Sequence, residues 1–172
     1  DVPRPQLVDI DGDGDLDLFV QERTDELMYF ENVGTARRAE FQWRTDRFQD
    51  VSVGEWARFF DVDGDGDLDL LAETPFSYIR LIQNTGGPTA PRFDVVVDSL
   101  RDVEGRPVFS DRQNIPNLTD IDCDGRADLF LGRVDGTVTR YEEAAVSPRG
   151  VPSYELRSTR FEDIEIVAAI AV

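Results

Sequence analysis

An acidic segment of nine residues occurs three times in this chain and constrains its fold more than any other feature. The copies span residues 9–17, 61–69 and 120–128, and each has Asp at positions one, three, five and nine. Carboxylates this close in the chain repel one another unless a cation lies among them, and short oxygen-bearing side chains suit calcium. The sequence therefore predicts three calcium-binding loops, with about one ion in each.

The spacing assigns to each ion the side chains of loop positions one, three, five and nine and the backbone carbonyl of position seven. The residues at these positions are Asp9, Asp11, Asp13, Asp17 and the Asp15 carbonyl in the first loop; Asp61, Asp63, Asp65, Asp69 and the Asp67 carbonyl in the second; and Asp120, Asp122, Asp124, Asp128 and the Arg126 carbonyl in the third. The glycines between them let the backbone turn, and Gly14 is expected to have a positive φ. The third loop departs from the others at Cys123 and Arg126.

Three other interpretations of the loops are less favoured. An EF-hand needs Glu at loop position twelve between helices, but Val20, Ala72 and Leu131 occupy that position within apolar runs. Magnesium demands stricter octahedral geometry and retains its waters. Asp-Gly pairs also favour simple turns, but turn formation does not explain the same four carboxylates in three copies.

An apolar run follows each loop and predicts a buried strand. The runs lie at residues 16–20, 68–72 and 127–131, and both alternating faces of each run are hydrophobic. Strands with two buried faces belong to a sheet covered on both sides. Because no amphipathic helix pattern is present, we expect other sheets to form the covering layers. Further strands are expected at residues 27–31, 41–47, 78–83, 93–97, 137–142 and 154–160.

The repeat period indicates a stacked array. The loops begin at Asp9, Asp61 and Asp120, so the pattern recurs after 52 and then 59 residues, and four short strands in each unit are typical of a propeller blade. The sequence predicts an all-β fold, a β-propeller fragment of about three four-stranded antiparallel blades. One repeat array would fill residues 1–172, with approximate blades at 1–54, 55–113 and 114–172. The third blade is expected to be the least regular.

Several recurring segments carry a resemblance to a known family. They are the Asp-x-Asp-Gly-Asp-Gly-Asp-Leu-Asp-Leu loops, Tyr29-Phe-Glu-Asn-Val-Gly-Thr35 and Leu131-Gly-Arg-Val-Asp-Gly136. Together they resemble the FG-GAP or VCBS repeats of integrin-type β-propellers, over essentially the whole chain. The resemblance implies calcium loops between the first and second strands of each blade, in rings of about seven blades. Three blades cannot close such a ring, so we expect the remaining blades of a longer chain, or a second copy, as partners.

Composition excludes several classes of function. The formal charge of −18 makes nucleic acid and anionic membrane surfaces unfavourable partners. The chain has no His, which removes Ser-His-Asp and Cys-His catalysis, and Cys123 has no second Cys with which to form an internal disulfide. No run approaches the roughly 18 apolar residues that cross a bilayer, so no membrane insertion is expected. No signal peptide is visible at the N-terminus, and we expect either a removed leader or a piece of a longer secreted or cell-surface protein.

Three functions remain open. The first, implied by the resemblance, is a non-catalytic, calcium-binding extracellular module for adhesion or protein binding. The second is a glycan-binding or accessory module of a secreted polysaccharide-active enzyme, and the third is part of a catalytic propeller. Among the aromatic residues, Trp43 and Tyr78 are the expected exposed candidates for sugar stacking, whereas most others are expected to pack between blades. No catalytic residue is assigned, because nothing singles out one carboxylate pair.

Overall fold

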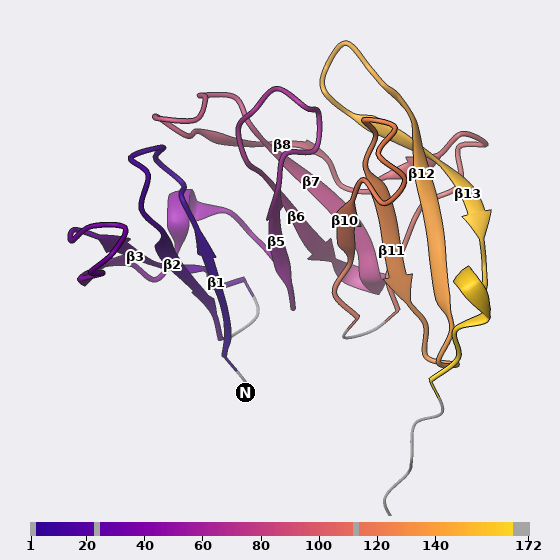
Figure 1. Cartoon of the computed structure of the whole chain (residues 1–172), viewed down its shortest axis with the longest axis horizontal. Helices are drawn as coiled ribbons and strands as arrows, with labels where there is room; N and C mark the ends of the chain where they lie inside the picture. Colours follow the sequence, from indigo (N-terminus) through magenta and orange to yellow (C-terminus); the bar gives the residue numbers. More distant parts are fainter. Residues whose placement is uncertain (1–2, 23–24, 112–113, 167–172) are drawn as a thin grey trace, which may run out of the picture.

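The computed structural model describes residues 3–22, 25–111 and 114–166 and has an all-β architecture. In these ranges there are three sheets and no α-helix, with short 3-10 turns at Phe48–Asp50 (η1), Pro75–Ser77 (η2) and Phe161–Asp163 (η3). The sheets follow one another along the chain, and the second lies between the other two (Figure 1). The prediction of an all-β chain built from antiparallel sheets is confirmed.

The first two sheets have the same arrangement of four antiparallel strands. The first contains β1 (Arg4–Val8), β2 (Asp17–Gln21), β3 (Met28–Asn32) and β4 (Phe41–Thr45), and the second contains β5 (Ala57–Phe60), β6 (Asp69–Thr74), β7 (Tyr78–Asn84) and β8 (Phe93–Val97). Each strand pairs with the next one along the chain, so both sheets are simple meanders. The strands predicted after the first two loops are present, with ends that differ by at most two residues.

The third sheet has one strand more than the sequence predicts. Its meander consists of β10 (Asn117–Thr119), β11 (Asp128–Gly132), β12 (Val138–Val146) and β13 (Pro152–Ser158). A short fifth strand, β9 (Arg101–Asp102), pairs in parallel with β13. The prediction of four antiparallel strands is therefore wrong for this sheet, because the longer approach segment adds its own edge strand. The β12–β13 pair also contains two register shifts.

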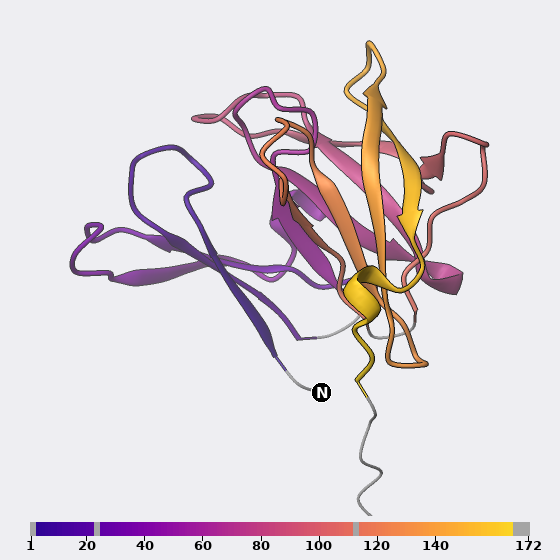
Figure 2. The same ribbon diagram turned by 45° about the vertical axis from the view of Figure 1, so that its right-hand side comes forward.

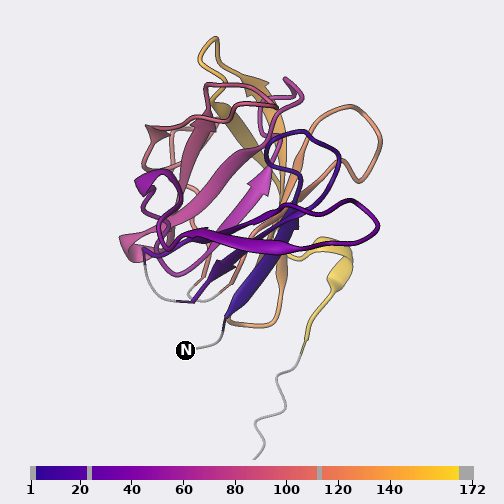
Figure 3. The same cartoon turned by 90° about the vertical axis from the view of Figure 1, so that its left-hand side faces the viewer.

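The second sheet is covered on both faces. Every residue of β6 is buried, and successive side chains of a strand point to opposite faces. Leu70 packs into a cluster with Phe19 of the first sheet, whereas Leu71 packs into a second cluster with Leu129 of the third sheet. The first sheet lies in front of the others when viewed from its own side (Figure 3). Sheet-on-sheet packing therefore supplies both cores, as expected.

The outer sheets bury one face more fully than the other. In β2, Phe19 is fully buried while Leu18 and Val20 on the other face are half-buried. In β11, Leu129 and Leu131 are buried, but Phe130 is only half-buried. The expectation that all three apolar runs are covered on both sides is thus confirmed only for the middle sheet, since each outer sheet has one neighbouring sheet (Figure 2).

The aromatic side chains divide as the sequence predicts, with two exceptions. Trp56 and Tyr154 are fully buried between sheets, and Trp43 is 56% exposed. Tyr78 is half-buried rather than exposed. Phe76 is 88% exposed, because η2 places it at the tip of the turn between β6 and β7.

Candidate metal sites in three strand-connecting loops

The three acidic loops, named loops one, two and three in chain order, connect the first two strands of each meander at one end of the molecule. The strand ends pair identically in all three sheets, Val8 with Asp17, Phe60 with Asp69 and Thr119 with Asp128. The same register places loop position nine at the start of the second strand each time. All three loops lie at the upper end in Figure 1.

Carboxylates from positions one, three and five converge in every loop. One oxygen from each member of a triad lies within 4.8 Å of the other two, in the triads Asp9, Asp11 and Asp13; Asp61, Asp63 and Asp65; and Asp120, Asp122 and Asp124. The loop backbone fixes this arrangement, because the N–H at position six donates to the carboxylate at position one. These bonds run from Gly14 to Asp9 (3.0 Å), from Gly66 to Asp61 (3.1 Å) and from Gly125 to Asp120 (2.9 Å).

Glycine permits the tight turn inside each triad. Gly14 has φ +92°, as predicted, and Gly66 and Gly125 have nearly the same value. Position four is also left-handed, with φ +70° at Gly12 and φ +61° at Cys123. A side chain at such a φ carries strain that glycine avoids. Cys123 is therefore a less favourable residue for this backbone than the glycine in the other two loops.

The position-nine carboxylates lie at the base of the loops and bind backbone amides. Asp69 is 1% exposed and accepts from the N–H of Val62 (3.2 Å) and the N–H of Asn84 (2.8 Å). Asp17 is 2% exposed and accepts from the N–H of Asn32 (2.7 Å). These residues, predicted as side-chain ligands, join the loop to the third strand of the sheet and lie outside the position-one, -three and -five triads.

The position-seven side chains are a feature that the sequence reasoning missed. Only the backbone carbonyls of Asp15 and Asp67 were expected to take part, but the side chains of both residues are buried, at 8% and 5% exposed. In each, Oδ1 has no hydrogen-bond partner within the described residues. The signal was present, because loops one and two both have Asp at this position where a carbonyl ligand requires no particular side chain.

Burial and mutual repulsion raise the pKa values of the carboxylates. Desolvation raises the pKa of Asp69 to about 7, and desolvation together with the charges of Asp65, Asp63 and Asp61 raises that of Asp67 to about 6. The pKa values of Asp15 and Asp17 are also raised, chiefly by burial. A bound cation would reverse this effect by stabilising the ionised carboxylates.

These shifts predict a pH dependence for the metal-free protein. The folded-state pKa of Asp69 and of Asp67 lies above the unfolded value, so the folded state binds more protons between about pH 4 and 7. We expect the melting temperature of metal-free protein to rise as the pH falls from 8 to 5. Thermal denaturation across this range checks it, and Asp67→Asn, which removes one of the contributing groups, should reduce the slope of the curve. A melting temperature that falls on acidification contradicts the prediction.

Each of loops one and two is in contact with the strand-connecting turn of the next sheet. A Cβ on Gly12 would lie 2.8 Å from the carbonyl oxygen of Pro88, in the β7–β8 turn. A Cβ on Gly150, in the β12–β13 turn, would clash with Asp63 Oδ2. The acidic loops are therefore also part of the packing between neighbouring sheets.

Asn32 and Asn84 organise the turns beside loops one and two. Asn84 Oδ1 accepts from the backbone N–H groups of Gly86 (3.0 Å) and Arg92 (2.9 Å), and Asn32 Oδ1 accepts equivalently from Gly34 and Glu40. The sequence reasoning treated these residues only as turn signals. Their backbone amides bind the position-nine carboxylates, so each Asn links an acidic loop to the hairpin that follows it.

Loop three differs from the others because arginine side chains lie in it. Arg140 of β12 donates from Nη2 to Asp122 Oδ2 (2.7 Å) and from Nε to Asp128 Oδ1 (2.8 Å). Hydrogen bonds to these two carboxylates raise the pKa of Arg140. Arg126, at position seven, is exposed and lies 3.9 Å from Asp124. No arginine of the described ranges forms an ion pair with an aspartate of loop one or two.

The fit of the loops to a cation follows from their unpaired oxygens. Buried carboxylate oxygens without a hydrogen-bond partner occur at Asp9, Asp15 and Asp17 in loop one and at Asp67 in loop two. Leaving buried charged oxygens unpaired is costly, and a calcium ion takes such oxygens as ligands. Loop three, described in full, has no such oxygen. Loops one and two therefore fit calcium, and loop three does not fit it in the same way.

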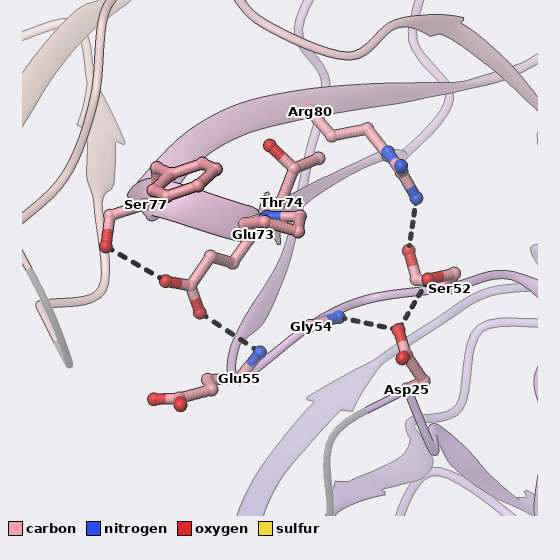
Figure 4. A pocket seen from close by; sticks show the side chains of 10 residues that line it. Asp25, Ser52, Gly54, Glu55, Glu73, Thr74, Ser77 and Arg80 are labelled. Atoms are coloured by element: carbon pink, nitrogen blue, oxygen red, sulfur yellow. Dashed lines mark hydrogen bonds between the residues drawn. The ribbon is translucent and has the colours of Figure 1, made fainter.

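A separate cavity lies at the opposite end of the sheets, between the first and the second. It has a volume of about 540 Å³, and Asp25, Glu73 and Arg80 are among the residues that line it. Two of its carboxylates accept hydrogen bonds: Asp25 accepts from the backbone N–H of Gly54 and from the Ser52 hydroxyl, and Glu73 accepts from Glu55 N–H and the Ser77 hydroxyl (Figure 4). These bonds hold turns together, and Glu55 also lines the cavity.

Comparison with known proteins supports the assignment of the repeat. The model of the FG-GAP-like repeat matches residues 9–72. This segment begins at the first residue of loop one and ends within β6, so it contains loops one and two but not loop three. Searches of curated proteins and of solved structures found no match. The predicted resemblance is confirmed over the matched segment. None of the helices in the described ranges has the length and apolar character needed to cross a membrane.

Proposed function

We propose that this chain, which carries an FG-GAP-like repeat over residues 9–72, is a calcium-binding part of a β-propeller that serves as a non-catalytic extracellular binding module. Repeats of this family are typically non-catalytic and extracellular, and they suggest a propeller. The observation that carries the calcium assignment is the set of buried, unpaired carboxylate oxygens beside the converging aspartates of loops one and two. Calcium-binding extracellular modules hold the ion with dissociation constants of about 10⁻⁴ to 10⁻³ M.

The ions would have a structural role. Asp9, Asp11, Asp13, Asp15 and Asp17 would hold one, and Asp61, Asp63, Asp65, Asp67 and Asp69 would hold the other. A bound dication would neutralise the repulsion that now raises the pKa values of Asp15 and Asp67. Since loop one packs against the turn at Pro88 and loop two against the turn at Gly150, ion binding would also stabilise the contacts between sheets.

Calcium is expected to raise the melting temperature. Each occupied site adds about 2.7 kcal/mol to the free energy of unfolding at a hundredfold excess over its dissociation constant, and the shift should be larger with calcium than with equimolar magnesium. Calorimetry of metal-free and calcium-loaded protein measures it. The variant Asp13→Asn/Asp65→Asn, which removes one exposed carboxylate from each loop, should abolish most of the shift. An unchanged melting temperature at about 100 mM calcium, a hundredfold excess over a dissociation constant of about 10⁻³ M, would refute the proposal.

A turn that occurs twice in the chain supports the proposal that a further sheet packs against the third one. In η1, Gln49 reaches the second sheet, where Nε2 donates to Pro91 O (2.8 Å) and Oε1 accepts from Phe93 N–H (3.0 Å). The sequence Arg-Phe-Gln-Asp of this turn recurs as Arg-Phe-Glu-Asp in η3, where Glu162 is exposed. We propose that η3 docks a further blade through Glu162, whose carboxylate can accept a backbone N–H as Gln49 Oε1 does but cannot donate as Gln49 Nε2 does.

A glycan-binding function is the second candidate. Trp43 and Phe41 alternate on β4, so they share a face, and they are 56% and 44% exposed. Exposed aromatic rings beside one another suit the apolar faces of sugars. A glycan array compared between the native chain and Trp43→Ala separates this function from protein binding, which has no requirement for sugar.

A further inference from the structure

We propose that Arg140 occupies the place of the metal ion in loop three, so that the chain binds two calcium ions and holds its third acidic loop with its own side chains. This inference rests on the proposed calcium sites of loops one and two. It changes the expected number of ions from three to two, and it assigns to Arg140 and Arg126 a role that the repeat pattern does not contain.

The contacts of Arg140 show how the replacement works. The guanidinium bridges Asp122 and Asp128, which are loop positions three and nine, through two hydrogen bonds of 2.7 Å and 2.8 Å. The side chain is 17% exposed and that of Asp128 only 1%. A guanidinium that donates to two carboxylates offsets one of their two negative charges and fixes their geometry. Arg140 thus joins the middle of the loop to the start of β11, two points that a metal ion would otherwise connect.

The register of the sheets shows that this arginine is particular to the third repeat. Arg140 pairs with Phe130, two residues after the position-nine aspartate. The residues at the same register are Tyr29, which pairs with Phe19, and Leu81, which pairs with Leu71. Neither of these can supply a positive charge. Loops one and two therefore contain the acidic cluster without an internal cation.

The hydrogen bonds at the base of loop three differ from those in loops one and two because of this arginine. In loops one and two, Oδ1 of the position-nine aspartate accepts a backbone N–H, from Asn32 and Asn84 respectively. The corresponding residue of the third sheet is Glu143, and its N–H instead donates to Ala127 O (3.2 Å). Arg140 Nε donates instead to Asp128 Oδ1, the oxygen that accepts a backbone N–H in the other two loops. The bond from the N–H of Ile121 to Asp128 Oδ2 (3.1 Å) is kept, as from Val62 to Asp69 in loop two, so the arginine replaces one of the two base contacts.

Arg126 completes the charge balance. It replaces the buried aspartate of position seven, so loop three has one carboxylate fewer than the others and one more positive charge. Together Arg126 and Arg140 bring two positive charges, the same as one calcium ion. Glu142, which lies 3.6 Å from Arg140 and binds Arg157, extends the network into β13. A calcium ion added to this loop would meet the guanidinium of Arg140 and the exposed Arg126, and it would have to break the two hydrogen bonds of Arg140.

Counting bound ions tests the proposal. Equilibrium dialysis with calcium-45 is expected to give two ions per native chain. Asp120→Asn/Asp124→Asn, which alters exposed carboxylates of loop three, should leave the count at two. The matched change in loop two, Asp61→Asn/Asp65→Asn, should reduce it to one. Three ions in the native chain, or a loss of an ion on altering loop three, would overturn the proposal and leave calcium binding itself intact, whereas no bound ion would overturn the proposed function.

Restoring the repeat pattern provides the converse experiment. Arg126→Asp/Arg140→Leu gives loop three the residues that loop two has at Asp67 and Leu81, and it should raise the count to three. Arg157→Leu removes an arginine from the same network without touching the loop, and it should leave the count at two. Circular dichroism establishes that each variant is folded. A folded double variant that still binds two ions would overturn the proposal.

Discussion

Truncating either Leu70 or Leu71 to Ala is expected to lower the free energy of unfolding by about 2–5 kcal/mol, although the two residues are adjacent. Both side chains are fully buried. Leu70 packs against the first sheet and Leu71 against the third, because neighbouring residues of β6 point to opposite faces. Each change would leave a cavity in a different core.

Urea denaturation of the two single variants and the double variant measures this effect. Since the two side chains belong to separate clusters, we expect their effects to add within about 0.5 kcal/mol. Leu7→Ala, at a side chain that is 54% exposed on β1, serves as the control and should change stability far less. If only one of the two β6 variants is destabilised, the second sheet is not covered on both faces.

Replacing Asp69 with Ala should destabilise the protein whether or not calcium is present. The side chain accepts from two buried backbone amides, those of Val62 and Asn84, and a buried donor without a partner costs about 1–3 kcal/mol. The raised pKa of Asp69 reduces the net loss, because removing the carboxylate also relieves its unfavourable burial. We expect a net loss of stability that is smaller than the roughly 2–6 kcal/mol that two unpaired buried donors alone would cost.

Asp65→Ala is the matched comparison. Asp65 is exposed and accepts one hydrogen bond, from the N–H of Asp67 (3.0 Å). Its truncation should cost little in metal-free protein and should remove stability only where calcium would be bound. Thermal melts of both variants with calcium and with chelator separate the two roles. An Asp69→Ala variant as stable as the native chain without metal would show that the amide bonds do not hold the loop.

The structure divides the acidic positions into two groups that the repeat pattern alone treats as equal. Positions one, three and five converge at the tip of the loop, where a cation can approach them. Position nine, at Asp17, Asp69 and Asp128, is buried at the base and is bound by backbone or arginine donors. Loss of a tip residue and loss of a base residue should therefore have different consequences.

Much of the fold followed from local pattern. The runs after the loops are alternately or continuously apolar and became β2, β6 and β11, and Phe93–Val97 was located to the residue as β8. What the pattern did not reveal was β9, because Arg101–Asp102 has no apolar character and becomes a strand only by pairing with β13. The sequence also did not show that each outer sheet has one less buried face. Similar apolar runs are buried to different extents, according to whether a sheet has one or two neighbouring sheets.

The sequence by itself determined the repeat, the acidic loops and the β class, because carboxylate spacing and strand periodicity are local properties of the chain. Only the tertiary structure decided where the arginine side chains lie relative to the acidic loops. Arg140 lies 18 residues from Asp122 and 12 from Asp128 in the chain, and the pairing of β11 with β12 brings its guanidinium into loop three. An electrostatic balance of this kind depends on distances in space, which residue spacing does not contain.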